Sequence, residues 1–511
     1  MSRFNKKEGT ILPVKGISVE KPAEYIDDQS LRSSFNFEIA RSLIRKRAGE
    51  TELGVANTAT YTEIMVGREL TREDVKYNVR IGREKVERYN ATSTAWVDIT
   101  GTDLTGDTTD IIDTALPLLS GKAILCFTNN KDAIRKWVAT GNTSDLGGSP
   151  PIGKFVQEYK TYLVVANIGG GTDIVQRVQW SDTADPEEWT TGNAGSSDLV
   201  EDGGAITGMS LFGNYLCVHK RESIYLGYLV SSSDIFQFTR KATGAGSIAN
   251  SSIVNTPTGE QIFLASDGLR IFNGVSTAPI EAPVNEEIRD ELDDSLAYKS
   301  FGVLVKDKDE VWFFIPLSGS ATPNTVYKFN YKTRVLYKDS RAGATAAWVG
   351  SASAGKTWDE LEGTWDEQTW RWNDRGLNED SDQINIGHLD GSVTYSDETI
   401  KSDNGNAINA YFITKDFQGS QQVMSRWEGV ELWAKGGSVI VEYSVDGGNT
   451  WNSCSNSPVT LTSEFPSFDS PIKLWVDVVS SRFRLKFTNN STDEALTIKQ
   501  FVVDYKPRED R

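Results

Sequence analysis

The stretch Glu260-Gln-Ile-Phe-Leu-Ala-Ser-Asp-Gly-Leu-Arg-Ile-Phe-Asn-Gly274 decides the fold class of this chain. Two short apolar runs, Glu260–Ala265 and Leu269–Phe272, are separated by Asp267-Gly268 and followed by Asn273-Gly274. Asp-Gly and Asn-Gly supply the positive φ angles of tight turns, while the β-branched and aromatic residues between them favour strands. The stretch therefore predicts a β-hairpin.

The same strand-and-turn pattern recurs along most of the chain. Further short apolar runs bounded by Gly, Asn, Asp or Pro cover residues 123–128, 161–166, 215–219, 310–315 and 326–330. Between residues 155 and 340 the units return about every 45–50 residues, as in 155–189, 206–238 and 254–280, which is a typical propeller-blade period. The sequence predicts an all-β fold whose main domain is β-propeller-like.

The last hundred residues differ from the rest, because six longer strands alternate in polarity there. They cover residues 408–413, 429–433, 438–443, 474–478, 482–487 and 501–505. Alternation of this kind is typical of antiparallel strands with one solvated face, so we expect a C-terminal β-sandwich. Few helices are expected. The best candidate is Pro283–Leu292 with Asn285 as its N-cap, whereas Ser34–Arg47 fits either a helix or a strand.

Charge and aromatic residues mark the expected domain borders. The 511 residues have a net charge of −18, and 13 acidic residues against 4 basic ones fall within 350–404. Five tryptophans, at 348, 358, 365, 370 and 372, lie in or beside this acidic stretch. We therefore expect an N-terminal arm at 1–54 that contributes to subunit contacts, a propeller at 55–345, an acidic Trp-rich segment and linker at 346–404, and a sandwich at 405–511.

Composition excludes several classes of protein. Three widely spaced cysteines and two histidines allow neither a disulfide framework nor a zinc motif, so we expect no metal and no cofactor. The sequence starts without an apolar leader and has no run long enough to span a bilayer, so we expect cytoplasmic synthesis and no membrane insertion. The excess of acid argues against a protein that grips nucleic acid.

One motif has a defined physical role. Ser444-Val-Asp-Gly-Gly-Asn-Thr-Trp451 matches the Asp-box pattern, in which Ser444, Asp446, Gly448 and Trp451 close and support a hairpin. Repeated Asp boxes resemble sialidase-like propellers, but this copy lies in the expected sandwich. We interpret it as a structural hairpin.

For each of the other candidate sites, a structural role is favoured over a chemical one. The repeated Thr-Trp-Asp-Glu at 357–360 and 364–367 could form a carbohydrate-binding aromatic patch, although packing at a blade or subunit interface is favoured. No pair of carboxylates stands out for glycoside hydrolysis. Gly169-Gly170-Gly171 lacks the lysine and helix of a phosphate loop. We expect His219 to be a core residue of a strand and His388 to be a turn residue. The basic cluster of Arg41, Arg45, Lys46 and Arg47 could contact phosphate, form a solvated face or contact an acidic neighbouring subunit.

Several segments together resemble one protein family. Gln179–Trp189, with Ser181, Asp182, Asp185, Pro186 and Trp189, is similar to an element of the tail nozzle proteins of short-tailed bacteriophages, also called tail tubular protein B or packaged-DNA stabilisation proteins. Ala265–Gly274, the helix expected around Ile288, Asn324–Lys338 and Gly16–Gly49 resemble further elements in the same order. The resemblance covers most of residues 10–340.

The resemblance implies a structural, non-enzymatic virion protein assembled in the host cytoplasm. Such nozzles form a homohexameric tube below a connector or adaptor ring, carry tail fibres or a tail-tip plug, retain the packaged genome and conduct it at ejection. An acidic wall suits this task, because it lets double-stranded DNA pass without binding it. The alternative is a glycan-binding or glycan-cleaving propeller of a phage or bacterium.

Overall fold

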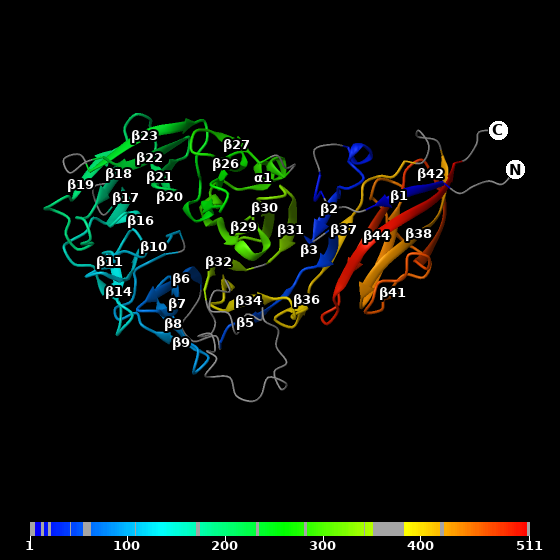
Figure 1. Ribbon diagram of the computed structural model, residues 1–511, viewed down its shortest axis with the longest axis horizontal. Coiled ribbons are helices and arrows are strands. Elements are labelled where there is room, and N and C mark those ends of the chain that lie inside the picture. The colour runs from blue at the N-terminus through cyan, green and yellow to red at the C-terminus, as the bar shows by residue number, and fades with distance from the viewer. Residues whose placement is uncertain are drawn as a thin grey trace.

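Seven sheets, antiparallel except where β5 (Gly49–Glu52) pairs with β35 (Ser402–Asp403) in the last one, form a ring, and a two-sheet sandwich lies beside it (Figure 1). In this computed structural model the described residues are 6–11, 15–18, 22–40, 42–54, 63–107, 109–169, 174–230, 235–280, 284–341, 343–350, 383–418 and 424–507. Within these residues the chain has seven propeller blades, which settles a number that the sequence left open.

Blades one to four each have four strands that run outward in chain order. Blade one contains β6 (Ile64–Arg72), β7 (Val75–Gly82), β8 (Val86–Asn90) and β9 (Ala95–Asp98). Blade two contains β10 (Asp113–Ala115), β13 (Leu125–Thr128), β14 (Arg135–Trp137) and β15 (Ser144–Asp145), with the small pair β11 (Leu118–Leu119) and β12 (Lys122–Ala123) beside it. Blade three contains β16 (Gly153–Tyr159), β17 (Tyr162–Ile168), β18 (Ile174–Trp180) and β19 (Gly195–Asp198). Blade four contains β20 (Ile206–Phe212), β21 (Tyr215–Lys220), β22 (Ser223–Leu229) and β23 (Phe236–Thr243).

The remaining blades follow the same plan until the last one. Blade five contains β24 (Val254–Asn255), β25 (Gln261–Ala265), β26 (Gly268–Phe272) and β27 (Thr277–Pro279), and blade six contains β28 (Phe301–Val305), β29 (Glu310–Ile315), β30 (Thr325–Asn330) and β31 (Leu336–Ser340). Blade seven contains β32 (Ala344–Val349), β33 (Ile384–His388), β34 (Val393–Asp397), the N-terminal β5 (Gly49–Glu52), β35 (Ser402–Asp403) and β36 (Asn406–Ala407). Short helices fill the loops: α1 (Asn285–Glu291), η1 (Ala23–Tyr25), η2 (Asn250–Ser252), η3 (Ala297–Lys299) and η4 (Lys306–Lys308).

The hairpin at 260–274 is formed by β25 and β26 of blade five, as its sequence predicts. All five residues of β25 and all six of β29 are buried. These strands in the middle of a blade are continuously buried and mostly apolar, because both faces of each blade pack against neighbouring blades and neither face is solvated. This explains why the alternating pattern of the C-terminal strands is missing from the propeller.

The ring closes with a strand from the other end of the chain. β5 pairs antiparallel with β34, and β32 of blade seven packs against β6 of blade one. Next to β5, the Leu53 N–H donates to the Val393 carbonyl at 2.7 Å, and Trp96 Nε1 of β9 donates to the Leu53 carbonyl at 3.0 Å. Leu53 therefore joins blade seven to blade one.

The sandwich is also built from both ends of the chain. One sheet contains β3 (Phe37–Ala40), β4 (Leu43–Lys46), β44 (Leu496–Pro507), β38 (Ser425–Gly436), β42 (Ile472–Ser480) and β1 (Lys6–Ile11). The other contains β2 (Ser33–Phe35), β37 (Ala410–Ile413), β43 (Arg484–Asn489), β39 (Ser438–Ser444), β40 (Asn452–Ser453) and β41 (Val459–Thr460). Their shared core includes Trp427, which stacks on Phe483 with ring centroids 4.9 Å apart.

Several expectations are resolved by these elements. Residues 34–47 form strands and not a helix, because their apolar side chains complete the two sheets of the sandwich. The expected borders shift accordingly: the arm at 1–54 enters both domains, and β33 and β34 of the expected linker belong to blade seven. Asn285 is not the N-cap of α1. It is the first helical residue, and its side chain instead accepts the Leu269 N–H of β26 at 2.9 Å.

A buried ionic cluster joins the propeller to the sandwich. Glu38 of β3 accepts two hydrogen bonds of 3.0 Å from Lys308 and one of 3.3 Å from Lys328. Lys328, which is fully buried, also pairs with the fully buried Asp339 and lies 4.0 Å from the ring centre of Trp312. Burial raises the pKa of Glu38, but Lys308, Lys328 and Arg45 outweigh it and hold that pKa well below its usual value.

The basic cluster of the N-terminal segment belongs to this joint. Arg45 donates to Glu398 at 3.0 Å, Lys46 donates to Asn489 at 2.8 Å, and Arg47 donates to Asp403 at 2.8 Å. These partners lie within the same chain, and Lys46 and Arg47 are buried, so these two side chains do not form a solvated face; Arg45 is partly exposed. Arg41 lies outside the described residues.

Candidate functional site

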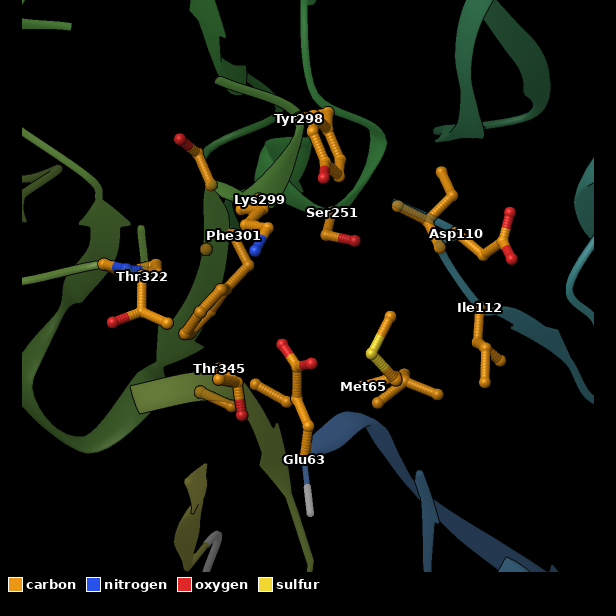
Figure 2. Close-up of a pocket in the computed structure, with 17 residues that line it drawn as sticks. Glu63, Met65, Asp110, Ile112, Ser251, Tyr298, Lys299, Phe301, Thr322 and Thr345 are labelled. Atoms are coloured by element: carbon orange, nitrogen blue, oxygen red, sulfur yellow. The ribbon is translucent and has the colours of Figure 1, made fainter. Parts of the chain in front are cut away.

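A cavity of about 90 Å³ lies beside the inner strands β6, β28 and β32 (Figure 2). Six separate parts of the propeller line it: the start of β6, the loop before β10, η2, the segment from η3 to β28, the loop before β30, and β32. The residues labelled in Figure 2 are Glu63, Met65, Asp110, Ile112, Ser251, Tyr298, Lys299, Phe301, Thr322 and Thr345. Inner strands converge on a propeller axis, which is why residues so far apart in sequence meet here.

Glu63 is the carboxylate that faces this cavity. It is 8% exposed, and Arg83 Nη2 donates to its Oε2 at 2.7 Å. Figure 2 shows the Glu63 carboxylate pointing toward the middle of the cavity, with the Tyr298 hydroxyl on the opposite side. The Arg83 pair holds the carboxylate in one orientation while leaving it able to accept further hydrogen bonds.

Asp110 lines the same cavity, but its carboxylate bonds to neighbouring residues. It accepts the Asp107 N–H at 2.7 Å and pairs with Lys131 at 2.9 Å. In Figure 2 it points away from Glu63. Glycoside hydrolysis by two carboxylates needs both groups to flank one bond. Glu63 and Asp110 do not provide that arrangement.

The hydroxyl groups of the cavity are suited to donate. Burial, followed by the charges of Glu63, Asp107 and Asp110, raises the pKa of Tyr298, so its hydroxyl keeps its proton. Ser300 is 1% exposed, and its Oγ has no hydrogen-bond partner among the described residues. Buried hydroxyls are normally paired, but burial also closes this Oγ to a ligand in the cavity.

Close to the cavity in sequence, β10 begins with a carboxyl group, Asp113, that has an unusual proton affinity. Asp113 of β10 accepts the Val156 N–H at 2.9 Å and the Thr114 N–H at 3.0 Å. Burial raises the pKa of Asp113 to about 6, against the opposing effects of these bonds, Arg68 and Asn250. The group therefore stays protonated in the folded protein over a range where the unfolded chain has lost its proton.

Asp113 should make the stability of the protein decrease between about pH 4 and pH 6. Its folded pKa lies above its unfolded value, so its contribution is fully present below pH 4 and is lost as the pH rises through 6. The loss is at most about 3 kcal/mol. We expect Asp113→Asn to gain stability relative to the wild type across this window, as measured by urea unfolding at each pH. Asp198→Asn, which removes an exposed partner of Arg177, should show no such gain; parallel profiles for the wild type and Asp113→Asn would contradict the assignment.

The Asp-box residues form a closed turn in the sandwich, between β39 and β40. Asp446 accepts the Ser444 hydroxyl at 2.7 Å and the Thr450 N–H at 3.0 Å, and Ser444 Oγ accepts the Gly448 N–H at 2.8 Å. Trp451 lies beneath the Lys486 ammonium at 5.6 Å. These hydrogen bonds join residues of the same loop.

The family-like motif closes blade three and fastens it to blade two. Ser181 Oγ accepts the Leu163 N–H at 3.0 Å, and Asp182 accepts the Asn193 N–H at 2.8 Å. Trp189 is buried among side chains of both blades, and its Nε1 donates to the Pro186 carbonyl at 2.9 Å. The Asp185 carboxylate accepts the Glu187 N–H at 3.0 Å. The motif residues make packing and turn contacts only.

Each of the two histidines hydrogen-bonds a neutral side chain, and His388 Nε2 also lies 3.9 Å from the Glu50 carboxylate. His219 is fully buried, bonds Gln261 at 2.7 Å, and burial lowers its pKa to about 4. His388 ends β33 and does not lie in a turn; it bonds Thr394 at 2.8 Å, which in turn donates to Glu50. Both Thr-Trp-Asp-Glu repeats, together with Gly170 and Gly171, lie outside the described residues.

Among the described residues, no group of three or more His, Cys, Asp or Glu side chains could hold a metal ion. No described helix has the length and apolar character needed to cross a membrane.

Sequence reasoning did not find the cavity. Its residues come from six distant segments, and Glu63 precedes β6, the first strand of blade one, without any recognisable motif. The one available signal was the propeller itself, since ligands of such folds often bind on the axis.

Comparison with known proteins does not place the chain in a family. No protein-family model matches it, and no curated protein matches it by sequence. Among solved structures it is similar to the extracellular domain of a hybrid two-component system from B. thetaiotaomicron, at 10% identity and a TM-score of 0.35, covering 64% of this chain and 40% of that one. It is similar to BamB from Moraxella catarrhalis, at 10% identity and a TM-score of 0.34, covering 69% and 97%.

A third similar structure is an exo-β-1,3-galactanase from Phanerochaete chrysosporium with galactose, at 9% identity and a TM-score of 0.28, covering 90% of this chain and all of that one. At these scores none of the three carries an argument about function. The sheets themselves define the class: an all-β protein with a seven-bladed propeller and a β-sandwich.

Proposed function

We propose that this protein is a non-enzymatic structural component of a virion, the tail nozzle of a short-tailed phage. The observation that carries the proposal is the role of the family-like segments. Gln179–Trp189 fastens two blades, Ala265–Gly274 forms a blade hairpin, and Gly16–Gly49 links the sandwich to the propeller. All three segments make structural contacts, as expected of a rigid scaffold.

The charge of the chain supports the same function. At −18 per subunit, a tube of six copies would present phosphates with a repelling wall, so that DNA slides past without forming ion pairs. The subunits would also repel one another, so their contacts have to bury substantial apolar surface. The N-terminal arm stays the candidate for part of those contacts.

The alternative of a glycan-cleaving propeller has less support. Its single Asp box is closed on itself, and the central cavity offers Glu63 without a second carboxylate aimed at the same point. A carboxylate pair is what such hydrolysis requires.

Assembly tests the proposal directly. We expect the purified chain, mixed with its connector complex, to form a six-fold ring in negative-stain images and to elute with that complex on sizing. The connector complex alone is the control. A chain that stays monomeric with the connector and cleaves glycans would refute the nozzle function and favour the enzyme.

A further inference from the structure

We propose that copies of this chain associate head to tail, with a rim of the propeller of one copy packed against the sandwich of the next. Two exposed apolar areas carry the inference, one on blades four and five and the other on the outer face of β42. The inference deepens the proposed nozzle function and rests on it for the expectation of a ring, because it names the surfaces by which neighbouring subunits meet.

The first area, the rim patch, is formed by the neighbouring turns β20–β21, β22–β23 and β26–β27. Tyr215 packs edge-on against Tyr228 with ring centroids 6.5 Å apart. A β-carbon built on Gly274 would lie 3.0 Å from the Phe212 ring, so the turn of blade five touches blade four. The patch is therefore continuous across the two blades. Its exposed apolar side chains, with exposed fractions from 43% to 73%, are Tyr215, Leu229, Val230 and Val275.

The segments that form the rim patch are uncharged. Residues 203–219, 223–230 and 271–280 contain no Asp, Glu, Lys or Arg, although 24% of the chain is charged. Two copies at −18 each repel one another wherever their acidic surfaces meet. A contact at an uncharged patch with exposed tyrosine avoids this repulsion, and such a composition is typical of the core of an interface. The patch therefore suits a strongly acidic partner, and a second copy of this chain is one.

The second area, the sandwich patch, lies on β42 and the loop before it. Phe468 is 73% exposed and stacks on Trp433 with ring centroids 5.7 Å apart. Trp475 is 56% exposed and pairs in register with Gly429, which has no side chain to cover the indole. Val479 lies four residues further along the same strand and on the same face. Exposed apolar groups gathered in this way mark interaction sites.

The charged side chains beside Trp475 are matched. Lys473 pairs with Glu431 at 3.4 Å, and Arg426 pairs with Asp477 at 2.8 Å. The acidic excess of the chain is therefore not concentrated at this patch either, so it can face the uncharged rim patch of another copy without repelling it.

The positions of the two patches fit a ring. Figure 1 shows β22 of blade four and β42 of the sandwich at opposite ends of the molecule. Contacts between two different surfaces are heterologous, and they close into a ring when the rotation from one copy to the next allows it. This is the symmetry that the proposed tube requires.

Sedimentation velocity of the purified full chain over a concentration series tests the contact. We expect the wild type to associate beyond the dimer at micromolar concentrations. Val275→Asp and Trp475→Asp should each weaken this association about tenfold or more, because each puts a charge into an apolar contact. Val200→Asp places the same charge on a valine that is 70% exposed after β19 of blade three, and it should associate like the wild type. All three positions are exposed, so the urea midpoints should stay close to that of the wild type.

Mixing the two variants distinguishes head-to-tail contact from other arrangements. Val275→Asp keeps an intact sandwich patch and Trp475→Asp keeps an intact rim patch, so the mixture should form a dimer of one copy of each and stop there. A wild type that stays monomeric at high micromolar concentration, a variant that associates like the wild type, or a mixture that stays monomeric would overturn the proposal. Assembly on the connector complex is a separate readout. If both variants form the six-fold ring as well as the wild type does, the nozzle function stands and this contact is not part of it.

Discussion

Lys328→Met is expected to lower the free energy of unfolding by about 3–5 kcal/mol at neutral pH. Lys328 is fully buried between Glu38 and Asp339, and the substitution leaves both carboxylates in the joint without this cation. Removing one partner of a buried ion pair is costly, because the remaining charge cannot be solvated. Urea unfolding followed by tryptophan fluorescence measures the loss.

A matched control separates burial from charge. Lys506→Met removes an ion pair with Glu428 on the surface of the sandwich, between β38 and β44, where the lysine is 39% exposed, and should cost less than about 1 kcal/mol. The double variant Lys328→Met with Asp339→Asn should recover part of the loss, since one unmatched charge is gone. If Lys328→Met costs no more than Lys506→Met, the ionic cluster does not hold the joint together.

Leu53→Pro is expected to open the propeller ring. It removes the N–H that bonds the Val393 carbonyl at 2.7 Å and disturbs the carbonyl that accepts from Trp96. A proline inside hydrogen-bonded structure costs about 3 kcal/mol or more. We expect a lower urea midpoint together with faster proteolysis of blades one and seven, located by mass spectrometry of the first fragments.

The control for this variant keeps the backbone intact. Leu53→Met conserves side-chain volume and the N–H, so its cost should stay below about 1.5 kcal/mol. If first cleavage in Leu53→Pro falls in other blades, then β5 and Leu53 do not close the ring.

Local sequence determined the strands, while chain-wide pairing determined the domains. Glu260–Ala265 and Leu269–Phe272 have turn residues at both ends, and the structure forms a hairpin there. Residues 34–47 were ambiguous because their apolar side chains satisfy both periodicities, and only β37 and β44, some 375 and 450 residues away, settle which applies. The border at 345 was wrong for the same reason, since the last blade is completed by β5.

The candidate site was less predictable than the fold. The Asp box and the Ser181–Trp189 motif could be recognised in the sequence because their residues lie close together in it. In the structure both motifs form turn and packing contacts. Glu63 and Ser300 carry no local signal, and they meet only because β6 and β28 lie around one axis. Predicting the cavity would have required the order of the blades around the ring.

The use of β1 to β5 in both domains has a consequence for biosynthesis. The ribosome makes these strands first, yet β5 pairs with β34 (Val393–Asp397) and β4 pairs with β44 (Leu496–Pro507). The propeller therefore cannot close before β34 has been made, and the sandwich cannot close before β44 has been made, although domains commonly fold one after another during synthesis. Until those partners are made, several hundred residues later, the early strands keep unpaired edges. Such long-range pairing slows folding, which makes this chain a natural client for chaperones that shield unpaired strands.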